Sequence, residues 1–309
     1  MEVIYQSKDF SRTFKNPVLT IGNFDGVHVG HQRIFQLLRD KALEIGGESV
    51  VYTFEPHPVE VLAPKRKPPI ITPLPEKLRL IEDQGIDVVI CATFSWEFAS
   101  QTPEEFVRKV LYDQIQIRQL FVGHDFTFGK GGGGDISLLK QFGRKWGFNV
   151  EVIEAVRVEG KVVSSSLIRE VILKGEMAEA AKLLGRHYLL SGQVIHGTGR
   201  GSRQIGFPTA NLNVAAELFP KPGIYAVWAL HQGRRYPAVA NLGWKPTFQD
   251  QQFSVEVHIL HFDQAIYGQS LQVEFVERLR DEVTFRNAEE LGIQIRRDIE
   301  QAQMILQMP

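Results

Sequence analysis

The first half of the chain alternates short apolar runs with segments of helical periodicity, and this alternation constrains the fold more than any other feature. The runs are nearly continuous in apolar residues, which is typical of strands buried on both faces. The pattern therefore predicts an α/β fold, a parallel sheet with helices on both faces. The expected strands are Val18–Ile21, Val50–Phe54, Asp87–Thr93, Gln119–Gly123 and Asn149–Ala155, with helices near 30–45, 76–84, 103–112 and 136–146.

After about residue 185 the pattern changes to short alternating strands separated by Gly, Pro and Asn. This change predicts antiparallel β-structure, and the turn 231–233 between two apolar runs suits a hairpin. The amphipathic segment from about Ala288 to Leu306 is a clear helix, so we expect a small barrel with a C-terminal helix. The expected strands are Tyr188–Ile195, Gly223–Leu230, Tyr236–Ala240, Phe253–His261 and Ser270–Val276.

A chain of 309 residues is long enough for two domains. Two helical stretches, 167–173 and 177–184, would complete the first domain before the pattern changes. We therefore expect an N-terminal domain of residues 1–184 and a C-terminal domain of residues 185–309.

The composition provides no overall basic field. Lys and Arg number 35 and Asp and Glu 36, so the formal net charge of −1 does not attract nucleic acid or an acidic membrane. The single cysteine, Cys91, excludes an intramolecular disulfide and a Cys-rich zinc site, and its apolar neighbours indicate burial. The N-terminus lacks the pattern of a signal peptide, and no apolar run is long enough to span a membrane. We expect a cytoplasmic protein.

The segment 22–31 places two histidines where the first expected strand passes into a helix. His28 and His31 are three residues apart, so they share one face of the first helical turn. Glycines let the backbone approach a ligand, and a helix N-terminus offers free N–H groups to phosphate. Histidines near a helix start are often ordinary surface residues. Here the strand, the glycine-rich turn and Asp25 precede them in the order that a nucleotide-binding α/β unit requires.

Two further polar segments follow later strands of the expected sheet. Residues 55–58 come after the second strand, and residues 124–129 come after the fourth. Ligands of parallel sheets bind at the carboxyl ends of the strands. We therefore expect these segments and the His28 segment to meet at one edge of the sheet.

Two motifs, taken in order, give the chain a family resemblance. His28-Val29-Gly30-His31 has the His-x-Gly-His signature of a nucleotidyltransferase superfamily, and Phe207-Pro208-Thr209-Ala210-Asn211 follows in the second half. Over nearly its whole length the chain resembles the prokaryotic bifunctional riboflavin kinase and FAD synthetase family. The resemblance implies a Rossmann-like nucleotidyltransferase domain followed by a riboflavin kinase β-barrel.

For the N-terminal domain, the resemblance implies that the phosphate of FMN attacks the α-phosphorus of ATP, giving FAD and pyrophosphate. His28 and His31 are implied to bind the triphosphate and to stabilise the charge that develops on it. Taken alone, a cap at the end of a strand would explain Asp125, and a serine N-cap with a solvated arginine would explain Ser164 and Arg169. The residues implied in the nucleotide or flavin pocket are Gly22, Asn23, Phe24, Asp25, Gly30, Asp125, Ser164 and Arg169.

For the barrel, the resemblance implies transfer of phosphate from ATP to riboflavin, with Mg²⁺ held by Thr209 and Asn211. Glu256 is implied as the base or orienting residue for the attacking hydroxyl, although most glutamates in alternating strands are merely solvated. An ion pair with Glu274 or Glu282 is an alternative for Arg278. The residues implied to bind nucleotide or flavin here are Gly197, Arg200, Gly206, Asn241 and Arg278.

The implied partners are small molecules: the substrates ATP, riboflavin and FMN, and the products FAD, ADP and pyrophosphate. We expect no nucleic-acid or membrane partner, and the oligomeric state stays open. In one alternative, only the first domain is catalytic and the barrel is a flavin-binding or docking module. In another, the first domain transfers a nucleotide to a different phosphate ester, and the barrel is an unrelated interaction domain.

Overall fold

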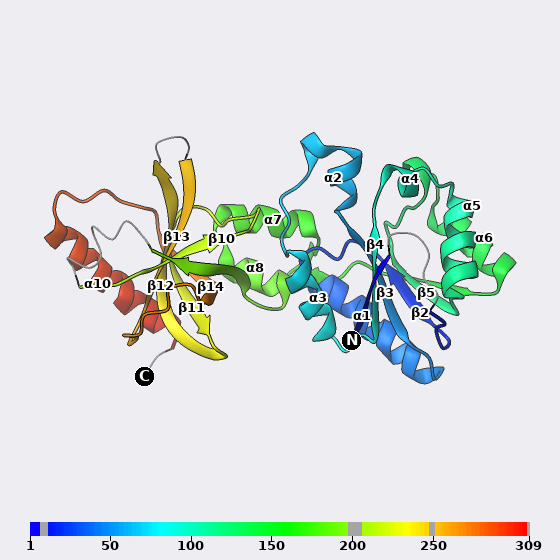
Figure 1. Cartoon of the computed structure of the whole chain (residues 1–309), viewed down its shortest axis with the longest axis horizontal. Helices are drawn as coiled ribbons and strands as arrows, with labels where there is room; N and C mark the ends of the chain where they lie inside the picture. The colour runs from blue at the N-terminus through cyan, green and yellow to red at the C-terminus, as the bar shows by residue number, and fades with distance from the viewer. Residues whose placement is uncertain (7–11, 197–205, 247–250, 308–309) are drawn as a thin grey trace. The chain divides into compact units, whose positions relative to one another are not determined.

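The computed structural model describes residues 1–6, 12–196, 206–246 and 251–307, which form two compact units (Figure 1). The first unit comprises Met1–Ser165 and the second Ser166–Pro309. The first contains a parallel sheet with helices, and the second a closed antiparallel barrel with a C-terminal helix. The predicted α/β class and the change to antiparallel structure are confirmed.

In the described part of the first unit, the sheet has six strands in the order β1-β4-β3-β2-β5-β6, all paired in parallel. The strands are β1 (Glu2–Gln6), β2 (Val18–Ile21), β3 (Ser49–Glu55), β4 (Val88–Thr93), β5 (Gln119–Gly123) and β6 (Asn149–Ile153). The edge strand β1 was not predicted, since its apolar run is only three residues long, 3–5. Cys91 on β4 is buried, as expected.

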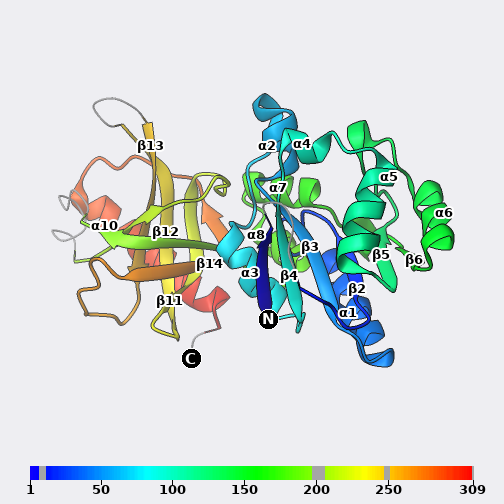
Figure 2. The ribbon, with the colours of Figure 1, turned by 45° about the vertical axis from the view of Figure 1, so that its right-hand side comes forward.

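Helices cover both faces of this sheet (Figure 2). On β2, Val18 packs against α1 (Val29–Glu44) and α3 (Leu74–Glu82), whereas Leu19 belongs to the opposite cluster. That second cluster contains α5 (Pro103–Phe106), the π-helix η2 (Val107–Ile115) and α6 (Ile136–Trp146). The expected helix near 103–112 is thus α5 continuing into η2. The short elements that were not predicted are α2 (Pro58–Leu62), η1 (Pro64–Arg66), α4 (Trp96–Ala99), η3 (Lys130–Gly132), β7 (Arg157–Val158) and β8 (Lys161–Val162).

The connections make a topological switch point between β2 and β5. From β2 the chain moves outward to β3 and then β4, and it returns to β5 on the other side of β2. The loops after β2 and β5 therefore leave adjacent strands in opposite directions, and ligands of such sheets bind at the carboxyl ends of the strands at this point. This edge is where the His28 loop and residues 124–129 were expected to meet.

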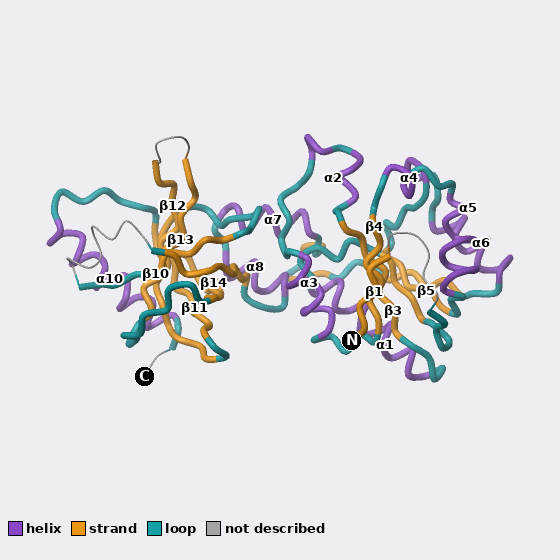
Figure 3. Tube along the Cα trace, viewed as in Figure 1, coloured by secondary structure: helices purple, strands orange, loops and turns teal. Residues whose placement is uncertain are grey.

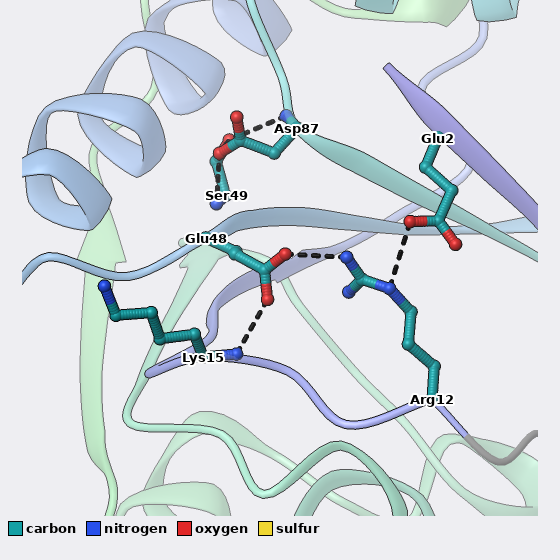
Figure 4. A network of polar contacts seen from close by, with 6 residues as sticks. All are labelled: Glu2, Arg12, Lys15, Glu48, Ser49 and Asp87. Carbon is teal, nitrogen blue, oxygen red and sulfur yellow. Dashed lines mark hydrogen bonds and ion pairs between the residues drawn. The ribbon is translucent and has the colours of Figure 1, made fainter.

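The amino ends of the strands are fixed by a polar network (Figure 4). Arg12 forms ion pairs with Glu2 at 3.0 Å and with Glu48 at 2.6 Å. Asp87, which directly precedes β4, accepts hydrogen bonds at Oδ2 from the N–H and hydroxyl of Ser49, the first residue of β3, at 2.8 and 2.7 Å. These contacts secure the sheet edge opposite the switch-point loops.

The strands of the second unit, orange in Figure 3, form a barrel that closes in the order β10-β13-β12-β11-β14-β9, and β9 also pairs with β10. Its interior is filled by fully buried side chains such as Tyr225 and Phe275. At residues 232 and 233 the φ angles are 48° and 74°, the left-handed pair that a tight hairpin needs, so the predicted turn is confirmed. The strands are β9 (Tyr188–Ile195), β10 (Ala210–Val214), β11 (Gly223–His231), β12 (Arg234–Pro246), β13 (Gln251–Ile259) and β14 (Ser270–Arg280).

Helix α10 (Ala288–Ile305) packs on the outside of the barrel against Ile224, Ala226 and Val239. Helices α7 (Ser165–Lys174) and α8 (Met177–Leu184) precede β9, and α8 contacts β9 and β14. No helix in the described ranges has both the length and the apolar character needed to cross a membrane.

We expect Asp298→Ala to lower the free energy of unfolding of the barrel unit by about 2–3 kcal/mol. The carboxylate of Asp298 on α10 accepts two hydrogen bonds from Arg280 of β14, at 2.9 and 2.7 Å, and the side chain of Asp298 is only 5% exposed. Its loss would leave a half-buried guanidinium without this partner. Urea unfolding followed by circular dichroism measures the change. The exposed Glu300→Ala on the same helix is the control, with an expected effect within about 0.5 kcal/mol.

Candidate active sites

The loop after β2 has an unusual backbone that buries apolar side chains. Phe24 and Val27 have φ angles of 49° and 40°, in the left-handed region that side chains larger than glycine rarely adopt. Both side chains are nevertheless buried in the sheet core, at 3% and 1% exposed. A Cβ at Gly22 would lie 3.0 Å from the ring of Phe24, so the ring occupies the space that this glycine leaves. Core packing thus determines the path of the loop.

His28 and His31 are brought together at the start of α1. His28 is the N-cap, and its Nδ1 accepts a hydrogen bond from the backbone N–H of His31 at 3.3 Å. The two imidazoles stack with centroids 3.5 Å apart, and the edge of Phe24 packs against His31. A Cβ at Gly30 would lie 3.0 Å from His28 Cε1. The stacked pair adds imidazole donors to a helix end that already favours anions.

Asp25 holds neighbouring segments in place. Its carboxylate is 4% exposed and accepts backbone N–H bonds from Ile71 at 3.1 Å and Thr72 at 3.0 Å. Its carbonyl accepts a hydrogen bond from the hydroxyl of Ser165 at 2.8 Å. These contacts give Asp25 a positioning role within the predicted pocket.

Asn23 has a different environment. Its carbonyl accepts hydrogen bonds from Lys77 at 3.3 Å and from the hydroxyl of Thr53 at 3.3 Å. Its side-chain oxygen Oδ1 is buried and has no hydrogen-bond partner among the described residues. Since buried polar groups are normally satisfied, this oxygen suits an N–H donor of a ligand. Lys77 was not predicted, although its spacing from Leu80 and Ile81 placed a lysine on the apolar face of a helix.

The loop after β5 lies beside the His28 loop, because β2 and β5 pair in register. Asp125 is exposed there, so its predicted contact with a ligand stays a prediction. The four consecutive glycines at 131–134 lie in a compact turn that includes η3. In this turn the backbone N–H of Lys130 donates a hydrogen bond to the carbonyl of Gln101 at 2.7 Å. Asp135 caps α6 by accepting a hydrogen bond from the N–H of Leu138 at 2.8 Å.

A cluster of aromatic rings extends from the carboxyl ends of β3, β4 and β5. Neighbouring rings in it have centroids 5.5–6.1 Å apart, in edge-to-face, tilted and stacked arrangements. The sequence motifs did not single out this cluster, since its members come from four separate segments. They are Phe54, Phe94, Phe98, Phe106, Phe126 and Phe128.

Ser164 and Arg169 flank the start of α7. Ser164 directly precedes the helix, Arg169 lies one turn into it, and both are half-buried. The described hydrogen bond to Asp25 comes from their neighbour Ser165. The predicted binding roles of Ser164 and Arg169 stay predictions.

In the barrel, three polar residues form a row across adjacent strands. Glu256 on β13 stands directly opposite Asn211 on β10 and Asn241 on β12. Opposite residues of antiparallel strands project to the same side, with Cβ atoms about 4.5–5.5 Å apart. The residues flanking Glu256, Val255 and Val257, are buried at 2% and 0% exposed, so the row faces outward from the barrel.

Glu282, two residues beyond β14, adds a second carboxylate to this row. The side chain of Asn241 hydrogen-bonds to the Glu282 carboxylate, and a Cβ at Gly243 would overlap that carboxylate. Desolvation raises the pKa of Glu282, and the negative charge of Glu256 raises it further. The hydrogen bond from Asn241 acts in the opposite direction and lowers this pKa. Asn241 Oδ1 is buried, with no hydrogen-bond partner in the described ranges. Glu282 was missed as a site residue because it arrives from a loop.

The segment that enters β10 is held by His258. Its Nδ1 donates a hydrogen bond to the carbonyl of Pro208 at 2.7 Å, and its ring meets the edge of Phe207. Thr209 follows immediately and is half-buried. This contact fixes the chain that carries Thr209 and Asn211 beside the strand of Glu256.

The remaining predicted residues have varied positions. Gly206 is exposed with φ 84°, whereas Gly197 and Arg200 lie outside the described residues. Arg278 donates to the carbonyl of Pro222 and forms an ion pair with Asp281 at 2.6 Å. Arg278 thus pairs with Asp281 rather than with Glu274 or Glu282, the partners considered from the sequence. The predicted binding role of Arg278 stays a prediction.

Comparisons with known proteins match both units. A family model for FAD synthetase matches residues 11–167, and one for riboflavin kinase matches residues 184–306. A bifunctional riboflavin kinase/FMN adenylyltransferase from Haemophilus influenzae is 37% identical over 303 residues, 98% of each chain. The chain belongs to the bifunctional riboflavin kinase/FMN adenylyltransferase family.

Other relatives of this riboflavin kinase/FMN adenylyltransferase family member have the same description. Proteins of the same description from Escherichia coli K12 and Bacillus subtilis are each 38% identical, covering 91% and 92% of this chain and 90% and 91% of theirs. A solved structure described as a macrolide-efflux protein from Streptococcus pneumoniae is 30% identical, with a TM-score of 0.89 over 98% of this chain and 99% of its own. The two polar sites of this family member fall one in each matched region.

Proposed function

We propose that the chain phosphorylates riboflavin to FMN in its barrel and transfers the adenylyl group of ATP to FMN, giving FAD, in its first unit. One observation carries this proposal. Each unit has its own polar cluster, the His28 and His31 pair at the switch point and the Asn211–Glu256–Asn241 row on the barrel. The two activities in the names of the relatives support the pairing of the two reactions.

In the adenylyl transfer, the phosphate oxygen of FMN attacks the α-phosphorus of ATP and pyrophosphate leaves. The stacked imidazoles and the N-terminus of α1 would bind the triphosphate and stabilise the negative charge that develops during transfer. Asp25 would keep the loop in the shape that this contact needs, through its bonds to Ile71 and Thr72. The protein's contribution is positioning and charge stabilisation.

The acceptor FMN has a flat aromatic ring, and the ring cluster around Phe54 and Phe128 offers it apolar, aromatic contacts at the same end of the sheet. A mostly apolar pocket beside a few polar groups is the usual form of a small-ligand site. This cluster supports a flavin as the acceptor over an arbitrary phosphate ester.

In the phosphorylation, a hydroxyl of riboflavin attacks the γ-phosphorus of ATP and ADP leaves. Glu256 would accept the proton of that hydroxyl or orient it, since its carboxylate stands at the centre of the outward row. Asn211 and Asn241 on either side would orient substrates through their amides. The unsatisfied Oδ1 of Asn241 suits a hydroxyl donor.

ATP is used in both proposed reactions, and we expect it to bind together with Mg²⁺. The hydroxyl of Thr209 and the amide oxygen of Asn211 are hard oxygen ligands of the kind that Mg²⁺ accepts, and they lie one strand from Glu256. Within the described ranges, no group of three His, Cys, Asp or Glu side chains could hold a metal ion. An ion held by Thr209 and Asn211 together with phosphate oxygens would neutralise phosphate charge.

We propose residues 1–184 and 185–309 as the catalytic domains. The riboflavin kinase family model begins at residue 184, whereas the division into compact units falls after Ser165 and assigns α7 and α8 to the second unit. We also propose a cytoplasmic location, where ATP and riboflavin are available.

The deciding experiment incubates the protein with riboflavin, ATP and Mg²⁺ and separates the flavins by chromatography over time. We expect FMN first and FAD after it, with FAD alone in a parallel reaction started from FMN. FAD formed only from added FMN would favour a non-catalytic barrel. If neither reaction gives a product while another phosphate ester reacts with ATP or CTP, the acceptor assignment is wrong.

A further inference from the structure

Lys77 is a buried lysine beneath the loop that carries the histidine pair. It lies on α3 with Leu80 and Ile81 on the face that packs against the sheet, and the residue is 6% exposed. Lysines are almost never buried to this degree unless they are paired. The position therefore calls for a reason beyond the packing of α3.

The ammonium of Lys77 is part of a closed set of three polar groups. Its Nζ donates to the carbonyl of Asn23 at 3.3 Å and to the hydroxyl oxygen of Thr53 at 3.4 Å. The Thr53 hydroxyl donates to the same carbonyl at 3.3 Å. Asn23 is the second residue beyond β2, so Lys77 and β3 fix the point at which the chain turns toward His28.

The charge of Lys77 is not neutralised by a dedicated partner. Over the described parts of the chain, its hydrogen bonds go to neutral groups and no ion pair with a carboxylate is formed. Asp25 and Glu55 are near enough to favour the charged form, but the Asp25 carboxylate is already held by the N–H groups of Ile71 and Thr72. The ammonium lies near these two carboxylates and offsets part of their negative charge beneath the loop expected to receive the triphosphate.

We propose that Lys77 is a positioning residue for adenylyl transfer, holding the Asn23 carbonyl so that the loop presents His28 and His31 and offsetting the negative charge of Asp25 and Glu55 near the bound phosphates. The inference rests on the proposed adenylyl transfer. Lys77 acts through the loop and does not itself touch the reacting atoms. A polar but neutral group at this position would keep part of the hydrogen bonding and lose the charge.

The test compares Lys77→Met, which keeps the length of the side chain without its charge or donors, with two controls. Thr53→Val removes a hydroxyl from the same set and keeps the charge, and Arg79→Met removes an exposed cation from the same helix. We expect Lys77→Met to lower kcat/KM for ATP in FAD formation by about 10–100-fold, with phosphorylation of riboflavin changed less than about twofold. Arg79→Met should match the unsubstituted protein, and Thr53→Val should fall between them.

Two further readouts separate this role from a purely structural one. Burial lowers the pKa of Lys77, against the opposing effects of Glu55, Cys91 and Asp25, so its charge is lost at a lower pH than that of an ordinary lysine. FAD formation should therefore decline on the alkaline side, and Lys77→Met should remove that decline. Binding of inorganic triphosphate, measured by calorimetry, should weaken in Lys77→Met about tenfold or more.

Several results would overturn the proposal: unchanged triphosphate affinity in Lys77→Met, an equal loss in Thr53→Val, or an alkaline decline that persists without the lysine. If the unsubstituted protein binds triphosphate but forms no FAD from FMN, the proposed reaction fails instead. The triphosphate comparison then still decides whether Lys77 supports anion binding at the loop.

Discussion

Glu256→Gln is expected to slow phosphorylation of riboflavin by about 10²–10⁴-fold, the usual contribution of a general base. Glutamine keeps the shape of the side chain and its place between Asn211 and Asn241, but it cannot accept the proton of the attacking hydroxyl. The loss should appear mainly in kcat, because the neighbouring amides still orient the substrates. Initial rates of FMN formation from riboflavin and ATP measure it.

The same substitution at an exposed site provides the matched control. Glu277→Gln on β14 changes a solvent-exposed glutamate of the same barrel and should leave the rate unchanged. FAD formation from added FMN should persist in both variants, since the adenylyl site is in the other unit. If Glu256→Gln phosphorylates riboflavin at the normal rate, Glu256 is not the base.

Asn211→Ala, which removes a proposed metal ligand, should likewise depress only the phosphorylation.

His28→Asn is expected to lower the rate of FAD formation by about 10²–10³-fold, a loss comparable to that of a charge-stabilising donor. Asparagine is a good N-cap, so it can still accept the hydrogen bond from the N–H of His31 and start α1. What it removes is the imidazole stacked on His31, and with it a donor to the triphosphate. Steady-state rates with FMN and ATP give the effect.

Comparison with His28→Ala separates the two roles of this histidine. Alanine removes both the cap and the imidazole, so it should lose about 1 kcal/mol of stability that asparagine retains. Riboflavin phosphorylation should continue in both variants. A His28→Asn protein with normal FAD formation would restrict His28 to capping, and loss of both activities in a folded variant would contradict two separate sites.

Strong periodicity made much of the fold predictable. Strand β5 and helix α6 begin and end where the apolar pattern does, because each buries one continuous set of side chains. Strands β1 and β10 were missed, since each is five residues long and only three of those residues are apolar, a signal too short to predict a strand by itself. The expected helix before β5 includes a π-helix, which its amphipathic pattern did not reveal.

Sequence spacing predicted the relative positions of site residues that are close together in the chain, but not contacts between distant segments. Alternation along β13 placed Glu256 on the opposite face from Val255 and Val257, and the His-x-Gly-His step put both imidazoles on one turn. The approach of Glu282 to Asn241 depends on a loop after β14, and the contact of Lys77 with Asn23 joins residues far apart in sequence. Such contacts are set by tertiary packing, which a single sequence does not encode at short range.

Asp25 makes the loop after β2 inseparable from two distant parts of the chain. Its carboxylate accepts hydrogen bonds from the backbone N–H groups of Ile71 and Thr72, and its carbonyl accepts one from the hydroxyl of Ser165. A graft of residues 22–31 alone into another scaffold would therefore bring a buried carboxylate without its donors. The smallest transferable piece of this half comprises three segments, and transplanting specificity between relatives requires exchanging them together.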